Sequence, residues 1–195
     1  VIQASAVMMP DKLIIMVHDS TVIGRGPLGS GEPAQDGILI ADNAVGLVIN
    51  NTLRDFEYTG GDWVATGILF FGSAGTASEN ILANAQTGIA AAGWDSGEWT
   101  VTFEKNSIEG SVSSGIHAEV WDPGASITLI VRDNELSEGL GDGVSVGLSP
   151  DYYPVGNVRI DVLNNTISKW QRGIYLMSSV VNRSTISGNK IVDNT

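Results

Sequence analysis

The 195-residue sequence has no cysteine and little positive charge, and both absences exclude functions. Without cysteine there is no disulfide framework, no thiolate metal site and no cysteine nucleophile. Ten Lys and Arg residues stand against 22 Asp and Glu residues, giving a formal net charge of −12. This balance argues against a nucleic acid or an anionic membrane as partner, since both require clustered positive charge. No apolar run approaches the roughly 20 residues of a transmembrane helix, so we expect no membrane insertion.

Helical periodicity is also missing, and the residues that are abundant indicate β structure. No stretch convincingly places apolar residues at the i, i+3, i+4 and i+7 spacing of an amphipathic helix. Only 16% of the residues are charged, whereas 24 residues are glycine. Such a composition is typical of many turns and few surface helices. Because 43% of the residues are hydrophobic, the chain can still bury a core.

A repeat organises the sequence. Six asparagines begin the triplet Asn-x-Ile or Asn-x-Leu, and we refer to them as the marker asparagines: Asn51, Asn80, Asn106, Asn134, Asn165 and Asn189. A second marker, a glycine followed by Ile or Val, keeps phase with the first and occurs at Gly37, Gly67, Gly88, Gly115, Gly143 and Gly173. Upstream of the first triplet, Ser20 takes the place of the asparagine. The spacing after Asn51 is longer than elsewhere and indicates an insertion through residues 59–62.

Each unit also alternates apolar and other residues with a period of two, as a strand with one buried face does. The first and third residues after a marker glycine, such as Ile89 and Ala91, are predicted to point inward. So are residues such as Val101 and Phe103, which precede a marker asparagine. The dense leucine pattern of leucine-rich repeats and the longer units of propeller blades are both absent. Short strands in units of this length predict a parallel β-helix, with coils about 4.8 Å apart.

The pattern Gly-Ile-x-Ile, followed later by x-Val-x-x-Asn-x-Ile, resembles the right-handed parallel β-helix repeat of pectate-lyase-like proteins over roughly residues 11–195. That superfamily includes polysaccharide lyases, galacturonases, mannuronan epimerases, phage tailspikes and non-catalytic surface proteins. The resemblance therefore implies a fold and leaves the activity open. We expect an all-β fold, a right-handed parallel β-helix solenoid of about seven coils.

We expect residues 1–195 to form a single domain, with a degenerate first coil in residues 1–36 and regular coils in residues 37–195. The start of the chain has no signal-peptide pattern, so we interpret it as a segment of a larger protein. The fold and its expected partners favour a secreted or cell-surface location.

Both markers are expected to be structural. The marker asparagines should form a ladder of buried amides that hydrogen-bond from coil to coil, each in the left-handed conformation that asparagine tolerates. The marker glycines should supply tight corners. Function is therefore to be sought on side chains that point outward.

The outward positions of the strand after each marker glycine change character along the chain. In the first three coils they are apolar and include Leu39, Leu69 and Phe71. A strand that is apolar on both faces is normally covered on both. We therefore expect this apolar face to be covered by a chain segment, another domain or a homo-oligomer partner. The last three coils carry instead His117, Glu119, Ser145 and Tyr175.

A tryptophan lies six residues after two consecutive marker glycines, at Trp94 and Trp121. Adjacent coils should stack these side chains into a flat apolar shelf with N–H donors at its edge, a surface suited to sugar rings. With Tyr152 and Tyr175, this pattern predicts a site that binds a polysaccharide or another glycan. The alternative is that both indoles are structural cover over a turn.

An aspartate follows each of these tryptophans, and Asp95 and Asp122 should therefore also stack. Two stacked carboxylates repel each other unless a cation or a proton intervenes. Calcium is the candidate cofactor at these two residues, because it prefers oxygen ligands. The alternative is that the Asp-x-Gly pattern is turn chemistry.

A weaker pattern indicates catalysis. His117 and Glu119 lie on one outward strand face and Asp122 follows at the corner, which would suit a polysaccharide lyase or a glycoside hydrolase. The resemblance to lyases implies an Arg or Lys base beside calcium ligands, and neither that arrangement nor the Asp-Pro-His-Glu pattern of epimerases occurs here. The paired aspartates of galacturonases are also missing. We therefore favour carbohydrate binding or a rigid scaffold role, with a lyase or hydrolase as the alternative.

One potential base has a simpler interpretation. Arg172 precedes its marker glycine as Asp142 precedes the marker glycine one coil earlier. The two side chains should therefore stack and form an ion pair.

Overall fold

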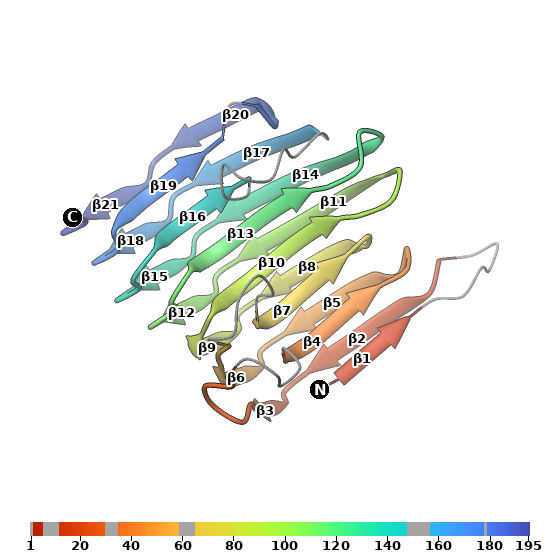
Figure 1. Ribbon diagram of the computed structural model, residues 1–195, viewed down its shortest axis with the longest axis horizontal. Helices are drawn as coiled ribbons and strands as arrows, with labels where there is room; N and C mark the ends of the chain where they lie inside the picture. Colours follow the sequence, from red (N-terminus) through yellow and green to blue (C-terminus); the bar gives the residue numbers. More distant parts are fainter. Residues whose placement is uncertain (1, 6–11, 30–34, 59–64, 148–156, 178) are drawn as a thin grey trace.

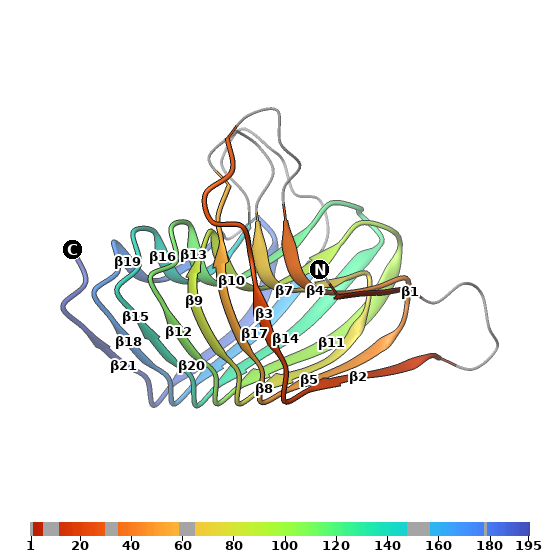
Figure 2. The same cartoon turned by 90° about the horizontal axis from the view of Figure 1, so that it is seen from below.

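The structure is a computed structural model, and it describes residues 2–5, 12–29, 35–58, 65–147, 157–177 and 179–195. Strands are its only regular elements in these ranges, and they form three parallel sheets of seven strands each (Figure 1). Each coil of the chain contributes one strand to each sheet in turn. Figure 2 shows the coils stacked side by side along one axis, from β1–β3 at one end to β19–β21 at the other.

Sheet A contains β1 (Ile2–Ser5), β4 (Asp36–Ala41), β7 (Thr66–Phe71), β10 (Thr87–Gly93), β13 (Ser114–Val120), β16 (Asp142–Val146) and β19 (Arg172–Leu176). Sheet B contains β2 (Ile14–His18), β5 (Val45–Ile49), β8 (Ala74–Ser78), β11 (Gly97–Glu104), β14 (Ala125–Arg132), β17 (Asn157–Leu163) and β20 (Val181–Ser187). Sheet C contains β3 (Thr21–Ile23), β6 (Thr52–Phe56), β9 (Ile81–Ala85), β12 (Ser107–Glu109), β15 (Glu135–Ser137), β18 (Thr166–Ser168) and β21 (Lys190–Val192).

The strand pairing follows the sequence repeat. In sheet A, Ile89 pairs with Ile68 of the coil before and with Ile116 of the coil after, and both pairings are parallel. Residues at the same offset from a marker glycine therefore lie in one column across the sheet. The expected parallel β-helix of about seven coils is confirmed, since each sheet contains seven strands.

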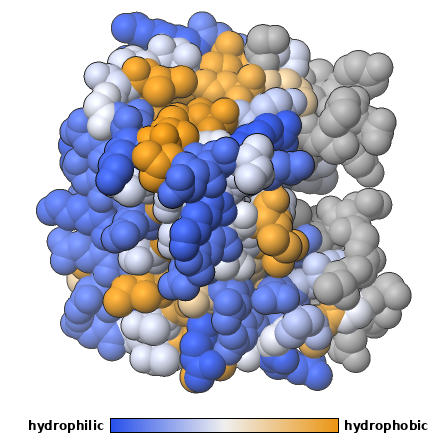
Figure 3. All heavy atoms as spheres, turned by 90° about the vertical axis from the view of Figure 1, so that its left-hand side faces the viewer, coloured by the Kyte–Doolittle hydropathy of each residue, from blue (hydrophilic) through white to orange (hydrophobic). Residues whose placement is uncertain are grey.

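The core runs along the inside of the solenoid. The residues predicted to point inward from β4 through β18 are almost fully buried; Ile89, Ala91, Val101 and Phe103, for example, are each at most 1% exposed. The columns end at the last coil, where the inward side chains of Ile186 and Ile191 are 51% and 45% exposed. Figure 3 shows apolar residues gathered toward this C-terminal end of the molecule.

The marker glycines do not form tight corners, so that expectation was wrong. Each is the second residue of its strand in sheet A, and none has the positive φ angle of a left-handed turn. They are glycine because neighbouring coils approach closely there. A Cβ built on Gly88 would lie 2.5 Å from the carbonyl oxygen of Gly115, and one on Gly115 would lie 2.8 Å from that of Gly143.

The marker asparagines form the expected ladder at the corner between sheets B and C. From Asn51 to Asn165, each Nδ2 donates to Oδ1 of the next marker asparagine at 2.9–3.0 Å. The same Oδ1 also accepts the backbone N–H of the preceding asparagine, and Nδ2 reaches a carbonyl oxygen of the coil before, as Asn80 does with Val48. All but the last, Asn189, are buried, so the ladder satisfies polar groups that water cannot reach.

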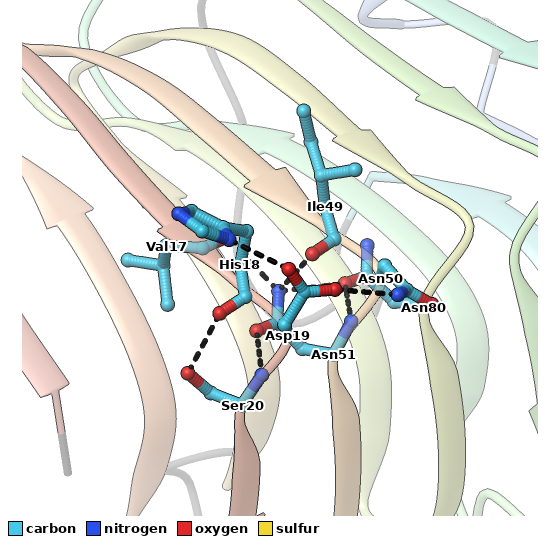
Figure 4. Close-up of polar contacts among 8 residues, drawn as sticks. All are labelled: Val17, His18, Asp19, Ser20, Ile49, Asn50, Asn51 and Asn80. Atoms are coloured by element: carbon cyan, nitrogen blue, oxygen red, sulfur yellow. Dashed lines mark hydrogen bonds and ion pairs between the residues drawn. The ribbon is translucent and has the colours of Figure 1, made fainter.

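Figure 4 shows the N-terminal end of this ladder. Ser20 occupies the asparagine position, and its backbone N–H donates to Asn51 Oδ1 at 3.0 Å. The left-handed conformation, however, belongs to the residue before each marker and not to the marker itself; Asp19 and Asn50 have φ angles of 52° and 54°. The expectation of a left-handed marker asparagine was therefore wrong. The sharp bend lies one residue before the marker, and it allows the side-chain amide of the marker asparagine to point inward.

Candidate functional site

The two tryptophans predicted to stack do lie together, at the corner that follows sheet A. Trp94 comes directly after β10 and Trp121 directly after β13, and their ring centroids are 5.3 Å apart. Phe71, at the end of β7, extends this aromatic row by one coil, with its centroid 6.2 Å from that of Trp94. The two indole planes are tilted by 43°, so they do not form the flat shelf that stacking alone predicts. Trp94 is 46% exposed.

A third tryptophan, which the sequence analysis did not single out, supports this corner from inside. Trp99 of β11 is 5% exposed, and its Nε1–H donates to Asn43 Oδ1 at 3.2 Å. The two glycines that bracket the Trp94 turn pack against it; a Cβ on Gly97 would lie 2.6 Å from Trp99 Cζ2, and one on Gly93 would lie 2.9 Å from Cζ3. The buried indole therefore packs beneath the Trp94 turn and fixes the position of that turn relative to the core.

The two aspartates beside the tryptophans differ in their surroundings. Asp122 Oδ1 accepts the backbone N–H of Gly124 at 2.7 Å and the hydroxyl of Ser96 at 3.2 Å. These contacts close the Trp121 turn and link it to the turn of the preceding coil. Asp95 is exposed. Within the described ranges no group of three or more His, Asp or Glu side chains has the arrangement of a metal site. Calcium binding by Asp95 and Asp122 therefore stays a prediction.

The predicted catalytic pair lies on the outer face of sheet A and has a partner that sequence reasoning missed. His117 Nε2 is 3.3 Å from Glu119 Oε2, and His117 Nδ1 is 2.8 Å from the hydroxyl of Ser145. Ser145 is paired with His117 across β13 and β16, and its Oγ lies 2.8 Å from that of Ser114. The signal was present in the repeat, since His117 and Ser145 both lie two residues after a marker glycine.

These four side chains form one hydrogen-bonded chain whose direction follows from donor and acceptor chemistry. An ionised Glu119 only accepts, so Nε2 of His117 carries the proton. In the neutral imidazole Nδ1 then accepts, and the hydroxyl of Ser145 donates to it. Ser145 has no second proton, so the hydroxyl of Ser114 donates to Ser145 Oγ. Asp122, which was grouped with His117 and Glu119 in the sequence analysis, contacts Gly124 of its own turn and Ser96 of the preceding coil's turn instead.

The expected ion pair between Arg172 and Asp142 is present and bidentate. Nε and Nη2 of Arg172 lie 2.5 and 3.0 Å from the two carboxylate oxygens of Asp142. The hydrogen bond to this carboxylate raises the pKa of Arg172. The guanidinium also lies over the ring of Tyr175, 4.0 Å from its centroid. Tyr175 pairs with Ser145 across β16 and β19, so it belongs to the polar part of sheet A and not to the aromatic corner.

The outward positions of sheet A predicted to be covered differ in their exposure. Leu39, Leu69 and Phe71 are half-buried, whereas Ala90 and Ala92 of β10 are buried at 6% and 5% exposure. Their covering by a partner stays a prediction. Tyr152, the remaining predicted sugar contact, lies outside the described residues.

The fold and the columns on its surface define the class of protein, a parallel β-solenoid with internal stacking and variable outward faces. The family described as the right-handed β helix region matches residues 36–195, and the chain belongs to this family. Comparison with curated proteins gives no significant match, and comparison with solved structures gives none either. Among the residues described, no helix has the length and apolarity to cross a membrane.

Proposed function

We propose that this β-helix binds a glycan along the corner that follows sheet A. The observation that carries the proposal is the aromatic row of Phe71, Trp94 and Trp121, with centroid separations of 6.2 and 5.3 Å. Sugar rings present an apolar face that packs on aromatic rings and hydroxyl groups that need hydrogen-bond partners. The row supplies the aromatic surface, and its partly exposed Trp94 makes that surface accessible to a ligand.

Polar groups lie close enough to the aromatic row to serve the hydroxyl groups of the same ligand. Glu119 is two residues before Trp121 on one outward face, about 7 Å along the strand, and His117 is about 7 Å further. Their side chains are 21% and 17% exposed. A glycan of two or three units that stacks on the tryptophans would therefore reach both groups. This ligand class is consistent with the acidic chain only if the glycan is neutral or if it is bound together with a cation.

Cleavage of a polysaccharide by a lyase or hydrolase is the second candidate function. The contact between His117 and Glu119 favours it, because an imidazole oriented by a carboxylate can accept a proton. With either function we propose a secreted or cell-surface location for the protein. A rigid scaffold without a ligand is the remaining possibility, and binding experiments separate it from the other two.

A glycan array with the wild type and Trp121→Ala tests the binding proposal. Loss of one stacking ring is expected to cost about 1–2 kcal/mol, or roughly tenfold in affinity. Leu140→Ala is the matched control, since Leu140 is a 72% exposed apolar side chain away from this corner. Equal binding by a folded Trp121→Ala variant would reject the corner as the site. A wild type that binds no neutral or acidic glycan would favour the scaffold role.

A further inference from the structure

We propose that Ser145 is a nucleophile, activated by His117 and oriented through Glu119, that removes small acyl groups from ester substrates. The proposal deepens the function above and rests on it for the nature of the substrate, which would be an O-acylated glycan. The chemistry itself rests on an independent observation, the hydrogen-bonded chain on the outer face of sheet A.

The geometry meets the requirement for an activated serine. Such a site needs a base within hydrogen-bond reach of the hydroxyl and a third group that orients the base. Nδ1 of His117 is 2.8 Å from Ser145 Oγ, and Glu119 lies 3.3 Å from the other ring nitrogen. Ser114 Oγ lies 2.8 Å from Ser145 Oγ, and when His117 is neutral with its proton on Nε2, Ser114 is the donor and the proton of Ser145 is directed at Nδ1.

The reaction follows from these positions. Oγ of Ser145 attacks the acyl carbon of the ester while its proton passes to Nδ1 of His117. The bond between the acyl carbon and the sugar oxygen then breaks, and the sugar oxygen takes the proton from His117 as it leaves. Water, deprotonated by the same nitrogen, then attacks the acyl carbon of the acyl–serine. The bond from that carbon to Oγ breaks, His117 returns the proton to Oγ of Ser145, and a carboxylic acid is released. Glu119 stabilises the imidazolium formed in each half of the cycle.

Burial of the serine limits the substrate. Ser145 is only 3% exposed, whereas the side chains of His117 and Glu119 are about a fifth exposed. The pair is flanked by Ala90 of the preceding coil, which lies beside His117, and by Tyr175 of the following coil, which lies beside Ser145. Gly147 follows Ser145 by two residues. An acyl group as small as acetyl fits such a narrow approach better than a long chain does. The site is therefore expected to prefer acetate esters.

The test measures hydrolysis of p-nitrophenyl acetate and p-nitrophenyl octanoate and maps the acetyl–enzyme adduct by peptide mass spectrometry. We expect hydrolysis of the acetate in preference to the octanoate, and an adduct on Ser145. Ser145→Ala should lose both the adduct and the hydrolysis. His117→Gln should lower the rate at least about a hundredfold, the scale of a general base. Ser126→Ala, at a half-buried serine of sheet B, is the control expected to keep the wild-type rate.

The outcomes separate this proposal from glycan binding. Hydrolysis of p-nitrophenyl acetate needs no sugar, so a protein that hydrolyses it through Ser145 without binding any glycan would overturn only the binding proposal. A wild type that binds glycans but forms no adduct on Ser145 would overturn only this one. Hydrolysis that survives in a folded Ser145→Ala variant would also overturn it. Circular dichroism and thermal unfolding of each variant identify any loss that is due to misfolding.

Discussion

Replacing one asparagine in the middle of the ladder should destabilise the solenoid far more than replacing the residue at its end. Asn106 is 1% exposed, and its side chain makes four hydrogen bonds. Oδ1 accepts from the backbone N–H and the Nδ2 of Asn80, and Nδ2 donates to the carbonyl of Ala77 and to Oδ1 of Asn134. Asn106→Ala removes all four.

The size of the stability loss follows from the hydrogen-bonding groups that Asn106→Ala leaves unpaired. The Nδ2 of Asn80 keeps its contact with Val48, and Oδ1 of Asn134 still accepts the backbone N–H of residue 106. The backbone N–H of Asn80 loses the side-chain oxygen that it donates to. An orphaned buried donor costs about 1–3 kcal/mol, and with the weaker terms the total is about 3–5 kcal/mol. This is a large part of the roughly 5–15 kcal/mol that stabilises a typical domain.

Ser20→Ala is the matched control at the end of the ladder. It removes only an exposed hydrogen bond to the carbonyl of His18, because the contact of Ser20 with Asn51 is made by its backbone. The expected loss is below about 1 kcal/mol. Urea unfolding followed by circular dichroism compares the two variants, and hydrogen exchange at the Asn80 amide reports the orphaned donor directly. Equal stability losses, with the Asn80 amide as protected as in the wild type, would refute the reasoning.

Three further predictions concern other parts of the chain. Gly139→Ala should cost about 2–3 kcal/mol in thermal unfolding, because its Cβ would lie 1.9 Å from the buried ring of Trp170; wild-type stability would contradict that packing. Burial raises the pKa of Asp36 above its usual 3.8, so the folded state binds the carboxyl proton more tightly than the unfolded state does. The free energy of unfolding should therefore fall as the pH rises from about 3.8 through the raised pKa. Asp36→Asn, which keeps an oxygen for the N–H of Thr66, should flatten this dependence and be no less stable at neutral pH; an unchanged profile would contradict it. If a second copy covers the apolar face, Leu69→Asp should dissociate a wild-type oligomer in light scattering, and a monomeric wild type would exclude that partner.

Much of the fold could be predicted because one repeat fixes both the strand positions and the faces of the strands. A period of two sets which side chain points inward, and the marker asparagine sets the register from coil to coil. The roles of the markers themselves were less accessible. The glycines are required by the carbonyl oxygens of the next coil, as at Gly88, and only a structure shows how closely two coils approach there.

The candidate site could be predicted only for contacts that depend on which residues share a column across the sheet. Equal offsets from the marker glycines brought Trp94 beside Trp121 and Asp142 beside Arg172, as expected. The tilt of the indoles depends on side-chain torsions, which the repeat does not specify. The contact of Ser145 with His117 was missed because an outward serine in a sequence has no preferred partner. That contact depends on the direction in which the His117 side chain turns.

The solenoid also explains why binding and chemistry would gather at one place on its surface. Inward positions are constrained by the core and the ladder, so variation along the chain is free mainly on the outward columns. On sheet A these columns change from buried alanine at Ala90 and Ala92 to polar side chains at His117 and Glu119 within a single coil spacing of about 4.8 Å. A sugar requires an apolar surface and polar partners within its own length, and that boundary is where both occur. Exchanging the outward residues of the two coils, Ala90→His with His117→Ala, should therefore keep the fold and abolish any ester hydrolysis, because Ser145 pairs with position 117 and not with position 90. Retained hydrolysis in the exchanged protein would show that column position does not determine the chemistry.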